Sequence, residues 1–446
     1  MRSHGRLRAD AAKIWAAGLR AVEPAAAVRR WMRREGEQLV VGRRRFRLDR
    51  GRRVWVLGAG KAAAPMARAV ETILGNRIHG GLVVTRYGYG LPLRRLTLLE
   101  AGHPFPDENG VAAAAGIARL AGTEIGAHDL VICLLSGGGS ALLAAPAPGI
   151  TLADKLACTR LLLNCGATIQ ETNAVRKHLS VVKGGGLARM LAAVRVISLI
   201  LSDVVGDDLD AIASGPLVPD TTTFADCKDI VRRLGIENRL PRAVRRRLDD
   251  GAGGGIPETP KPGDPIFRNK FPVMVGSNAQ ACGAAAAAAR RLGYRPLVLT
   301  SRLAGDTREA ARFHLSIAEE IAAAGRPVRR PACLISGGES TVLVTGKGKG
   351  GRNQEFVLQC VSGLARQQTP CVAASIATDG SDGPTDAAGA LADNRTLARS
   401  FESGSRFLED CIRDNDAYEF FRRLDDLVVT GPTRTNVMDL HLFMVG

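Results

Sequence analysis

The chain has 446 residues, which is too long for one hydrophobic core and predicts two or three domains. Apolar residues make up 46 % of it, which excludes a largely disordered protein, and no apolar run approaches the roughly 20 residues of a membrane span. Most of the net charge of +17 lies in residues 1–53, where there are sixteen Lys and Arg residues and five Asp and Glu residues. This stretch also has a helix-like apolar pattern and contains no recognisable nucleic-acid module. We therefore interpret it as a solvated basic face.

The cysteines and the N-terminal residues indicate in which cellular compartment the protein is expected. The nine cysteines include no Cys-x-x-Cys pair, and the seven histidines form no His-Glu-x-x-His motif, so a disulfide scaffold and a zinc site are not expected. The first residues lack the apolar segment of a signal peptide. We therefore expect a cytoplasmic enzyme.

The first half of the chain alternates short apolar runs with helix-like segments. This alternation predicts an α/β fold with mainly parallel sheets, and a Rossmann-like domain at the N-terminus. The expected strands are 54–57, 82–85, 96–99, 129–135 and 194–201.

A Gly/Pro-rich stretch then interrupts the pattern, and more strands follow it. We expect an N-terminal domain over 1–250, a linker over 251–265, and a second α/β domain over 266–446, with a cleft between the domains. The expected strands of the second domain are 272–275, 296–299, 332–335, 371–377, 427–430 and 440–444.

Glycine turns follow several of these strands, where parallel sheets bind their ligands. Glycine lets the backbone approach an anion closely, so the repeated turns favour a phosphate or carboxylate ligand over simple chain reversal. Residues 134–143 also resemble residues 334–343, which suggests one such loop in each domain. The predicted nucleotide- and phosphate-binding residues are Ser136, Gly137, Gly138, Gly139, Ser140, Gly276 and Asn278.

The first turn, at residues 58–63, matches the Gly-x-Gly-x-x-Ala form of a dinucleotide fingerprint. The acidic residue that would bind a ribose about 20 residues later is missing, and Arg86 stands in that region. The turn carries Lys61, which is either a surface lysine or, as we favour, an anion contact.

Two acidic clusters and one basic loop complete the candidate chemistry. Both acidic clusters follow apolar strands. A single aspartate at such a place is explained by a local turn. Two clusters together are typical of residues that bind Mg²⁺ and accept a proton in phosphoryl transfer. The basic loop at 346–355 is expected to be flexible and to open a helix, and its Arg352 has the shape for bidentate binding of a carboxylate or phosphate. The clusters are Asp203, Asp207 and Asp208, and Asp379, Asp382 and Asp386.

These motifs together resemble the bacterial-type (class II) glycerate 2-kinase family, whose C-terminal part is called the MOFRL domain. The resemblance covers nearly the whole chain. The blocks that carry it are 58–62, 102–104, 135–142, 173–180, 202–207, 336–341, 350–355, 377–383 and 430–433.

The resemblance implies transfer of the γ-phosphoryl group of ATP to the 2-hydroxyl of D-glycerate. Together with the metal chemistry of the acidic clusters, it makes ATP and Mg²⁺ the expected cofactors. It also implies that Lys61 and Arg352 hold the glycerate and the transferring phosphate. Our own assignment, which the pattern leaves open between the two clusters, gives Asp203 the proton and Asp207 and Asp379 the metal.

The chain departs from the family pattern at 305–307, where it has Gly-Asp-Thr, and at Arg434, where glycine is usual. Those changes affect local contacts without touching Lys61 or Arg352. The alternative activity is an NAD(P)H-dependent hydroxypyruvate reductase, a label that relatives have carried. A ligand-binding regulator without turnover is a third hypothesis. We expect no nucleic-acid or membrane partner and allow for a homodimer.

Overall fold

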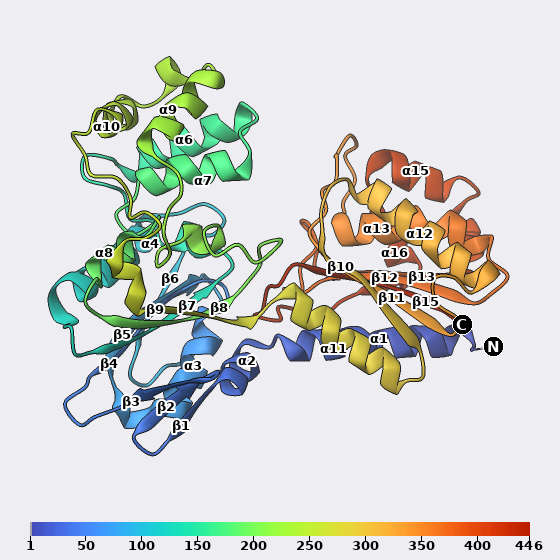
Figure 1. The fold of residues 1–446 in the computed structure, drawn as a ribbon. Coiled ribbons are helices and arrows are strands. Elements are labelled where there is room, and N and C mark those ends of the chain that lie inside the picture. Colours follow the sequence, from blue (N-terminus) through green and yellow to red (C-terminus); the bar gives the residue numbers. More distant parts are fainter. Residues whose placement is uncertain (1) are drawn as a thin grey trace. The chain divides into compact units, whose positions relative to one another are not determined.

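The computed structural model describes residues 2–446 of the chain. Their contacts divide into two units, which are coloured along the chain in Figure 1. The N-terminal unit is Pro24–Val275, and the C-terminal unit consists of residues 2–23 and Gly276–Gly446. Each is built on a six-stranded sheet, which confirms the α/β class.

The N-terminal unit contains the predicted parallel sheet. Its strand order is β6-β5-β4-β7-β8-β9, and the pairs from β6 to β8 are all parallel. The central strands are buried along their whole length, as expected for a sheet covered on both faces. The strands are β4 (Val54–Ala59), β5 (Ile78–Arg86), β6 (Thr97–Ala101), β7 (Leu130–Ser136), β8 (Arg195–Leu201) and β9 (Lys270–Gly276).

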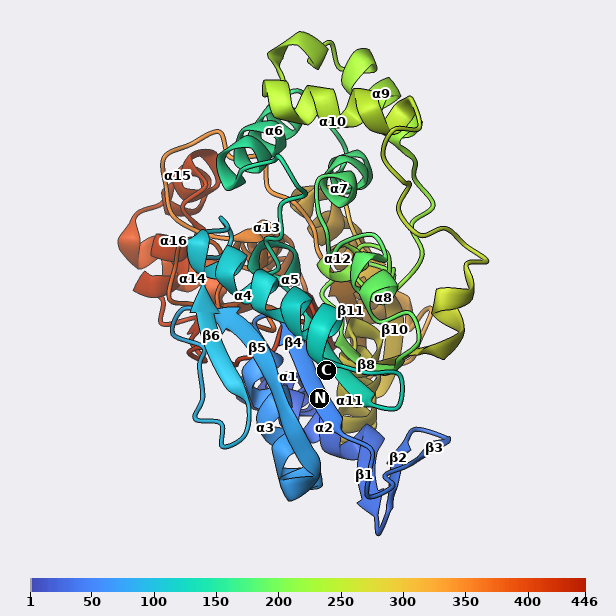
Figure 2. The same cartoon turned by 90° about the vertical axis from the view of Figure 1, so that its left-hand side faces the viewer.

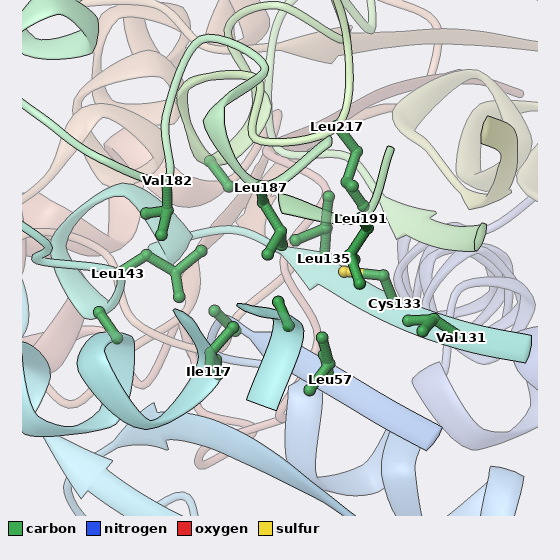
Figure 3. Close-up of a cluster of buried hydrophobic side chains, with 14 of the residues drawn as sticks. Leu57, Ile117, Val131, Cys133, Leu135, Leu143, Val182, Leu187, Leu191 and Leu217 are labelled. Atoms are coloured by element: carbon green, nitrogen blue, oxygen red, sulfur yellow. The ribbon is translucent and has the colours of Figure 1, made fainter. Parts of the chain in front are cut away.

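Helices of this unit cover the sheet and form a separate helical layer. Side chains of β4, β7 and α4 meet those of the segments around Leu187 and Leu217 in one core, which Figure 3 shows. A second core joins α6, α7, α9 and α10, which Figure 2 shows grouped together at the top of the view. The helices are α2 (Pro24–Trp31), α3 (Ala63–Leu74), α4 (Glu108–Arg119), α5 (Gly139–Leu142), α6 (Leu152–Asn164), α7 (Ile169–His178), α8 (Gly186–Met190), α9 (Phe224–Arg233) and α10 (Arg242–Ala252).

A small antiparallel sheet precedes β4 and was not expected from the sequence. It contains β1 (Met32–Glu35), β2 (Gln38–Val41) and β3 (Arg44–Arg47). Most of its arginines are exposed, and only a few apolar side chains face inward. Part of the basic N-terminal stretch therefore forms strands. They were not predicted because their many arginines look like a solvated charged segment.

The C-terminal sheet is mixed rather than mainly parallel, which corrects the prediction for this domain. Its order is β10-β11-β15-β12-β13-β14, and only β10 and β11 pair in parallel. The last strand enters between β11 and β12 and runs antiparallel to both. The strands are β10 (Arg295–Leu303), β11 (Ala332–Gly338), β12 (Cys371–Ala377), β13 (Gly389–Asp393), β14 (Leu427–Val428) and β15 (Asp439–Val445).

Alternation along β15 explains how helices cover both faces of this sheet. Leu442 and Met444 lie in the core with α1 and α11, whereas Phe443 and Val445 lie in the core with α12 and α13. Successive strand residues point to opposite faces, so an uninterrupted apolar strand must be covered twice. The helices are α1 (His4–Ala21), α11 (Asn278–Arg291), α12 (Thr307–Ala324), α13 (Arg352–Ala365), α14 (Thr396–Ser400), α15 (Phe407–Asp414) and α16 (Ala417–Arg423).

The observed division differs from the predicted 1–250 and 266–446 at two places. Helix α1 belongs with the later unit, because Leu7, Ala11 and Ile14 pack in the core with α11 and the C-terminal sheet. The predicted linker at 251–265 stays with the N-terminal unit, where Pro260 accepts a hydrogen bond from the amide of Asp220. Within residues 2–446 we find no helix with the length and apolarity needed to cross a bilayer.

Candidate active site

The turn after β4 places Lys61 at the carboxyl end of the N-terminal sheet. The amide of Lys61 donates to Gly137 O (2.8 Å), and the amide of Ala62 donates to Ser136 Oγ (3.0 Å). A Cβ on Gly60 would lie 2.1 Å from Ser136 Oγ, so glycine is needed here for the two loops to touch. These amides are therefore used inside the protein.

The second loop, after β7, connects Lys61 to further polar groups. Ser136 is buried and its hydroxyl accepts the Ala62 bond, whereas Gly138 and Ser140 are partly exposed. Ser140 Oγ lies 2.7 Å from Ser214 Oγ, and Ser140 O accepts a 2.8 Å hydrogen bond from Lys183 Nζ. The structure thus brings the two predicted loops of this unit into direct contact.

Gly138 has a φ of +83°, and a Cβ there would lie 2.8 Å from the His103 ring and 3.4 Å from Lys61 Cγ. We expect Gly138→Ala to lose about 1–3 kcal/mol of stability from the backbone and, by displacing Lys61, about 100-fold in kcat/KM. Gly149→Ala is the matched control, because Gly149 has a φ of +79° with no atom near its Cβ position. Thermal unfolding and kinetics of both variants check this; equal activity losses would contradict it.

The carboxylates predicted after β8 lie in a tight turn. Asp207 has a φ of +60°, and its amide donates to Val204 O. Asp208 accepts a bond from the amide of Asp210, so it forms the local Asx turn that its spacing allows. Asp203 and Asp207 are half-buried and follow the same strand end, which keeps them as candidates for proton or metal handling.

Asn278 has a structural role in the C-terminal unit. Its side-chain amide donates to Val437 O and Asp439 O, both at 2.8 Å, and its oxygen contacts Cys282 Sγ. Gly276, which precedes it, is buried. These bonds use both N–H groups of the Asn278 side chain, and the predicted ligand role of Gly276 and Asn278 remains a prediction.

The C-terminal unit contains a cavity of about 490 Å³ that joins three predicted features. Arg352, Ser340 and Asp382 line it, so the glycine loop after β11, the basic loop and the second acidic cluster meet at one place. The backbone amides of Lys347 and Lys349 in the basic loop donate to Asp414 and Asp416. Helix α13 begins at Arg352, as predicted.

Two carboxylates position Arg352. Its guanidinium binds Asp439 with two N–H groups, at 2.5 and 3.1 Å, and Glu339 with a third, at 2.7 Å. Guanidinium has five N–H donors, so two remain for a ligand. Burial raises the pKa of Asp439 to about 7 although Arg352 opposes the rise, and the carboxylates in turn raise the pKa of Arg352.

Asp382 caps the helix that starts at Arg352. Its two oxygens accept bonds from the amides and side chains of Asn353 and Gln354, at 2.9–3.1 Å. A Cβ on Gly351 would lie 2.3 Å from Asp382 Cγ, so only glycine lets the carboxylate sit this close to the helix. Burial raises the pKa of Asp382, and these hydrogen bonds counteract the rise.

Asp382→Asn should destabilise the C-terminal unit by about 1–3 kcal/mol, because an amide group would then face donors that need an acceptor. Helix α13 would shift at its first turn, so kcat/KM should fall as well. Asp386→Asn is the control, since Asp386 is exposed and its carboxylate accepts a bond from the Tyr418 hydroxyl. Chemical unfolding and steady-state kinetics would measure both effects, and equal stability of the two variants would contradict the capping role.

The predicted metal ligands Asp207 and Asp379 lie in different units. Asp379 forms a local turn, in which it accepts a bond from the amide of Ser381 at 3.1 Å. Over residues 2–446 no group of three or more His, Cys, Asp or Glu side chains is gathered as a metal site. The metal role of both aspartates stays a prediction.

Sequence reasoning missed several groups that border these sites. His103 lies beside the Gly138 position, and Lys183 binds the loop after β7. Glu339 and Asp439 hold Arg352. His103 and Glu339 stand inside blocks that carried the family resemblance, which was the available signal for them.

Comparisons with known proteins show which family the chain resembles. Residues 10–249 match the family described as "Domain of unknown function (DUF4147)", and residues 332–439 match the MOFRL family. A protein of Pyrococcus horikoshii named glycerate 2-kinase is 41 % identical over 96 % of this chain and 94 % of its own length. A protein of Agrobacterium vitis, 44 % identical over 88 % of this chain and 99 % of its own length, carries a provisional hydroxypyruvate reductase name.

The fold agrees as well. The crystal structure of a glycerate kinase from Thermotoga maritima matches with a TM-score of 0.87 and 36 % identity, covering 99 % of this chain and 100 % of that one. The likeness thus extends through both units and through every block that carries Lys61, the loop after β7 and Arg352. The chain belongs to the glycerate 2-kinase family.

Proposed function

We propose that this chain transfers the γ-phosphoryl group of ATP to the 2-hydroxyl of D-glycerate, giving 2-phosphoglycerate and ADP. The observation that carries the proposal is the 41 % identity over 96 % of the chain to a protein named glycerate 2-kinase. The positions of Lys61 at a strand end and of Arg352 at a cavity wall support it.

In the proposed reaction, the 2-hydroxyl oxygen forms a bond to the γ-phosphorus as the bond from that phosphorus to the ADP oxygen breaks. Asp203 takes the hydroxyl proton, and Lys61 neutralises the charge on the phosphoryl oxygens. The two unused N–H groups of Arg352 hold the glycerate carboxylate in a fixed orientation.

Mg²⁺ is the metal we propose, with Asp207 and Asp379 as its protein ligands. Magnesium in phosphoryl transfer takes one or two carboxylates and completes its shell with water and phosphate oxygens, so a preformed cluster is not required. Asp207 and Asp379 are both half-buried carboxylates that follow strands, which is the donor chemistry the ion prefers. The ion would neutralise charge on the phosphate chain.

A cytoplasmic location also belongs to the proposal. Across residues 2–446 the nine cysteines are free thiols and all but Cys165 are buried, which suits a reducing compartment. We retain the expectation of small-molecule ligands without nucleic acid or membrane, and of a homodimer as a state to be tested by sedimentation.

The direct test is a coupled assay of ADP formation with purified protein, D-glycerate, ATP and Mg²⁺. We expect ADP formation that requires D-glycerate, ATP and Mg²⁺. If L-glycerate gives no ADP, the site also distinguishes the configuration at carbon 2. Absence of ADP under these conditions would contradict the kinase assignment.

Hydroxypyruvate reduction is the second candidate, because the turn after β4 joins a strand to helix α3 as in a dinucleotide site. Two observations weigh against it. The amides of Lys61 and Ala62, which would face a pyrophosphate, are bonded inside the protein. No acid stands at the end of β5, where Arg86 is found instead. Oxidation of NADH or NADPH on adding hydroxypyruvate would support the reductase; we expect none.

A further inference from the structure

Three cations of the N-terminal unit lie close enough together to act on one another electrostatically. They are Lys155 on α6, Arg176 on α7 and Lys183 in the segment that follows α7. Lys155 is 9 % exposed and Lys183 is 2 % exposed, and Arg176 is half-buried. Within residues 2–446 none of the three forms an ion pair with a carboxylate. Such burial of like charges needs a reason, because isolated buried cations are costly.

The hydrogen bonds of these side chains leave most of their donors unused. Lys183 Nζ donates to Ser140 O at 2.8 Å, and Arg176 Nη1 reaches Asn173 Oδ1 at 3.4 Å. Lys155 Nζ is buried and has no hydrogen-bond partner among the described residues. An ammonium group carries three donors, so the cluster holds several that point to no protein acceptor.

Other buried lysines of the same unit are satisfied by the fold. Lys177 forms ion pairs with Asp210 and Asp220, although it directly follows Arg176 in the same helix. Lys270 donates to three backbone carbonyls, of which Leu191 O is the nearest, at 2.9 Å. By contrast, Lys155 has no hydrogen-bond partner among the described residues, and Lys183 has a single carbonyl partner.

The pKa shifts of the two lysines also indicate that the three cations repel one another. Burial, and then the charge of Arg176, lowers the pKa of Lys155 to about 7. Burial, followed by Arg176 and Lys155, lowers the pKa of Lys183 well below its ordinary value. No carboxylate counteracts either shift, so a bound anion would relieve both desolvation and repulsion.

The cluster adjoins the loop that carries the candidate chemistry. Lys183 binds Ser140, and the same loop accepts the amide of Lys61 at Gly137 O. Ser140 and Arg176 are both partly exposed, so each can be contacted from solvent. A phosphate chain lying along the loop after β7 would thus meet Lys61 and then this cluster.

We propose that Lys155, Arg176 and Lys183 form a binding site for phosphate groups next to the loop after β7. The identity of the natural ligand rests on the proposed function: it is either the phosphate chain of the nucleotide or the phosphate of the phosphorylated product. The shared chemistry is a phosphoryl anion that accepts several charged hydrogen bonds at once.

The test compares the binding of inorganic pyrophosphate, ADP and 2-phosphoglycerate to wild-type protein and to Lys155→Met by titration calorimetry. We expect affinity for pyrophosphate to fall roughly 10- to 100-fold, the range for one hydrogen bond to a charged group. Loss for ADP alone assigns the site to the nucleotide, and loss for 2-phosphoglycerate alone assigns it to the product. Arg160→Met is the matched control, because Arg160 is an exposed cation on the same helix. Unchanged affinity for all three probes would overturn the proposal.

Thermal unfolding separates a binding role from a structural one. Lys155→Met removes an unpartnered buried cation, so without anion the variant should melt at the same temperature as wild type or higher, and pyrophosphate should no longer raise its melting temperature. Lys183→Met should lose the same response. If both variants fail to fold, the cluster is structural and the proposal is wrong. The two proposals can fail separately. If the protein makes no ADP from glycerate and ATP but still binds pyrophosphate in a way that depends on Lys155, the phosphate site is supported and the kinase assignment is contradicted.

Discussion

Lys61→Ala is expected to lower kcat/KM for glycerate phosphorylation at least about 100-fold, the scale of losing one charge-stabilising group at a reacting centre. The fold should survive, because the bond from the Lys61 turn to Gly137 O uses the backbone amide and not the side chain. Circular dichroism and thermal unfolding would establish the fold, and the coupled assay would measure the loss.

Arg68→Ala is the control for this variant, since Arg68 is an exposed cation on helix α3, which follows the same turn. It should retain wild-type kinetics. A Lys61→Ala protein as active as wild type would remove Lys61 from the mechanism, and a Lys61→Ala protein that does not fold would make the residue structural.

Arg352→Ala should also lower kcat/KM at least about 100-fold, because the side chain offers the carboxylate or phosphate two charged donors. The sequence alone suggests that the fold is unaffected. The structure predicts otherwise, since Arg352 is the partner of the buried Asp439. Breaking a buried pair on one side destabilises by about 3–5 kcal/mol, so the C-terminal unit should unfold at lower denaturant concentration.

The stability loss in Arg352→Ala should depend on pH. Burial already raises the pKa of Asp439 from 3.8 to about 7, and loss of Arg352 raises it further. In the unfolded chain the Asp439 carboxyl ionises once the pH exceeds its ordinary pKa of 3.8, whereas in the folded variant it stays protonated to higher pH. The folded state therefore binds more protons in this range. As a result, the free energy of unfolding falls as the pH rises from 3.8 through about 7. Unfolding of the variant measured across this window should show the fall.

The double variant Arg352→Ala with Asp439→Asn separates structure from catalysis. Asparagine carries no charge to bury, so the double variant should regain most of the stability and lose its pH dependence, but none of the activity. If activity returned together with stability, Arg352 would be a structural residue and its contact with substrate would be excluded.

Local sequence patterns predicted the strands well where burial is complete. Strand β7 is an apolar run up to Ser136 and β12 is apolar except for Ser375; both are followed by glycine turns and are buried along their length. Strand β3 was missed because its alternation is three arginines around Phe46, which looks like a solvated charge run. The direction of the C-terminal sheet was missed for another reason: β15 pairs between β11 and β12 across more than sixty residues of chain, and no local pattern encodes that pairing.

The candidate site was predictable where glycine and charge occur together. Lys61 and Arg352 were found because each stands in or beside a glycine loop at a predicted strand end or helix start. The use of the turn's amides was not visible, because a hydrogen bond from Ala62 to Ser136 joins residues 74 positions apart. Lys155 was missed because a lysine among apolar helix positions is normally exposed, and only the packed helices show that its ammonium is buried.

The position of the phosphate in the product tests the kinase assignment most directly, and phosphorus NMR of the reaction mixture measures it. Phosphorylation at the 2-hydroxyl places the phosphorus three bonds from a single proton, so we predict a doublet together with the signals of ADP. A triplet from a neighbouring CH₂ group would show transfer to the 3-hydroxyl, and a spectrum of unconsumed ATP would show that glycerate is not the acceptor; either result would contradict the account.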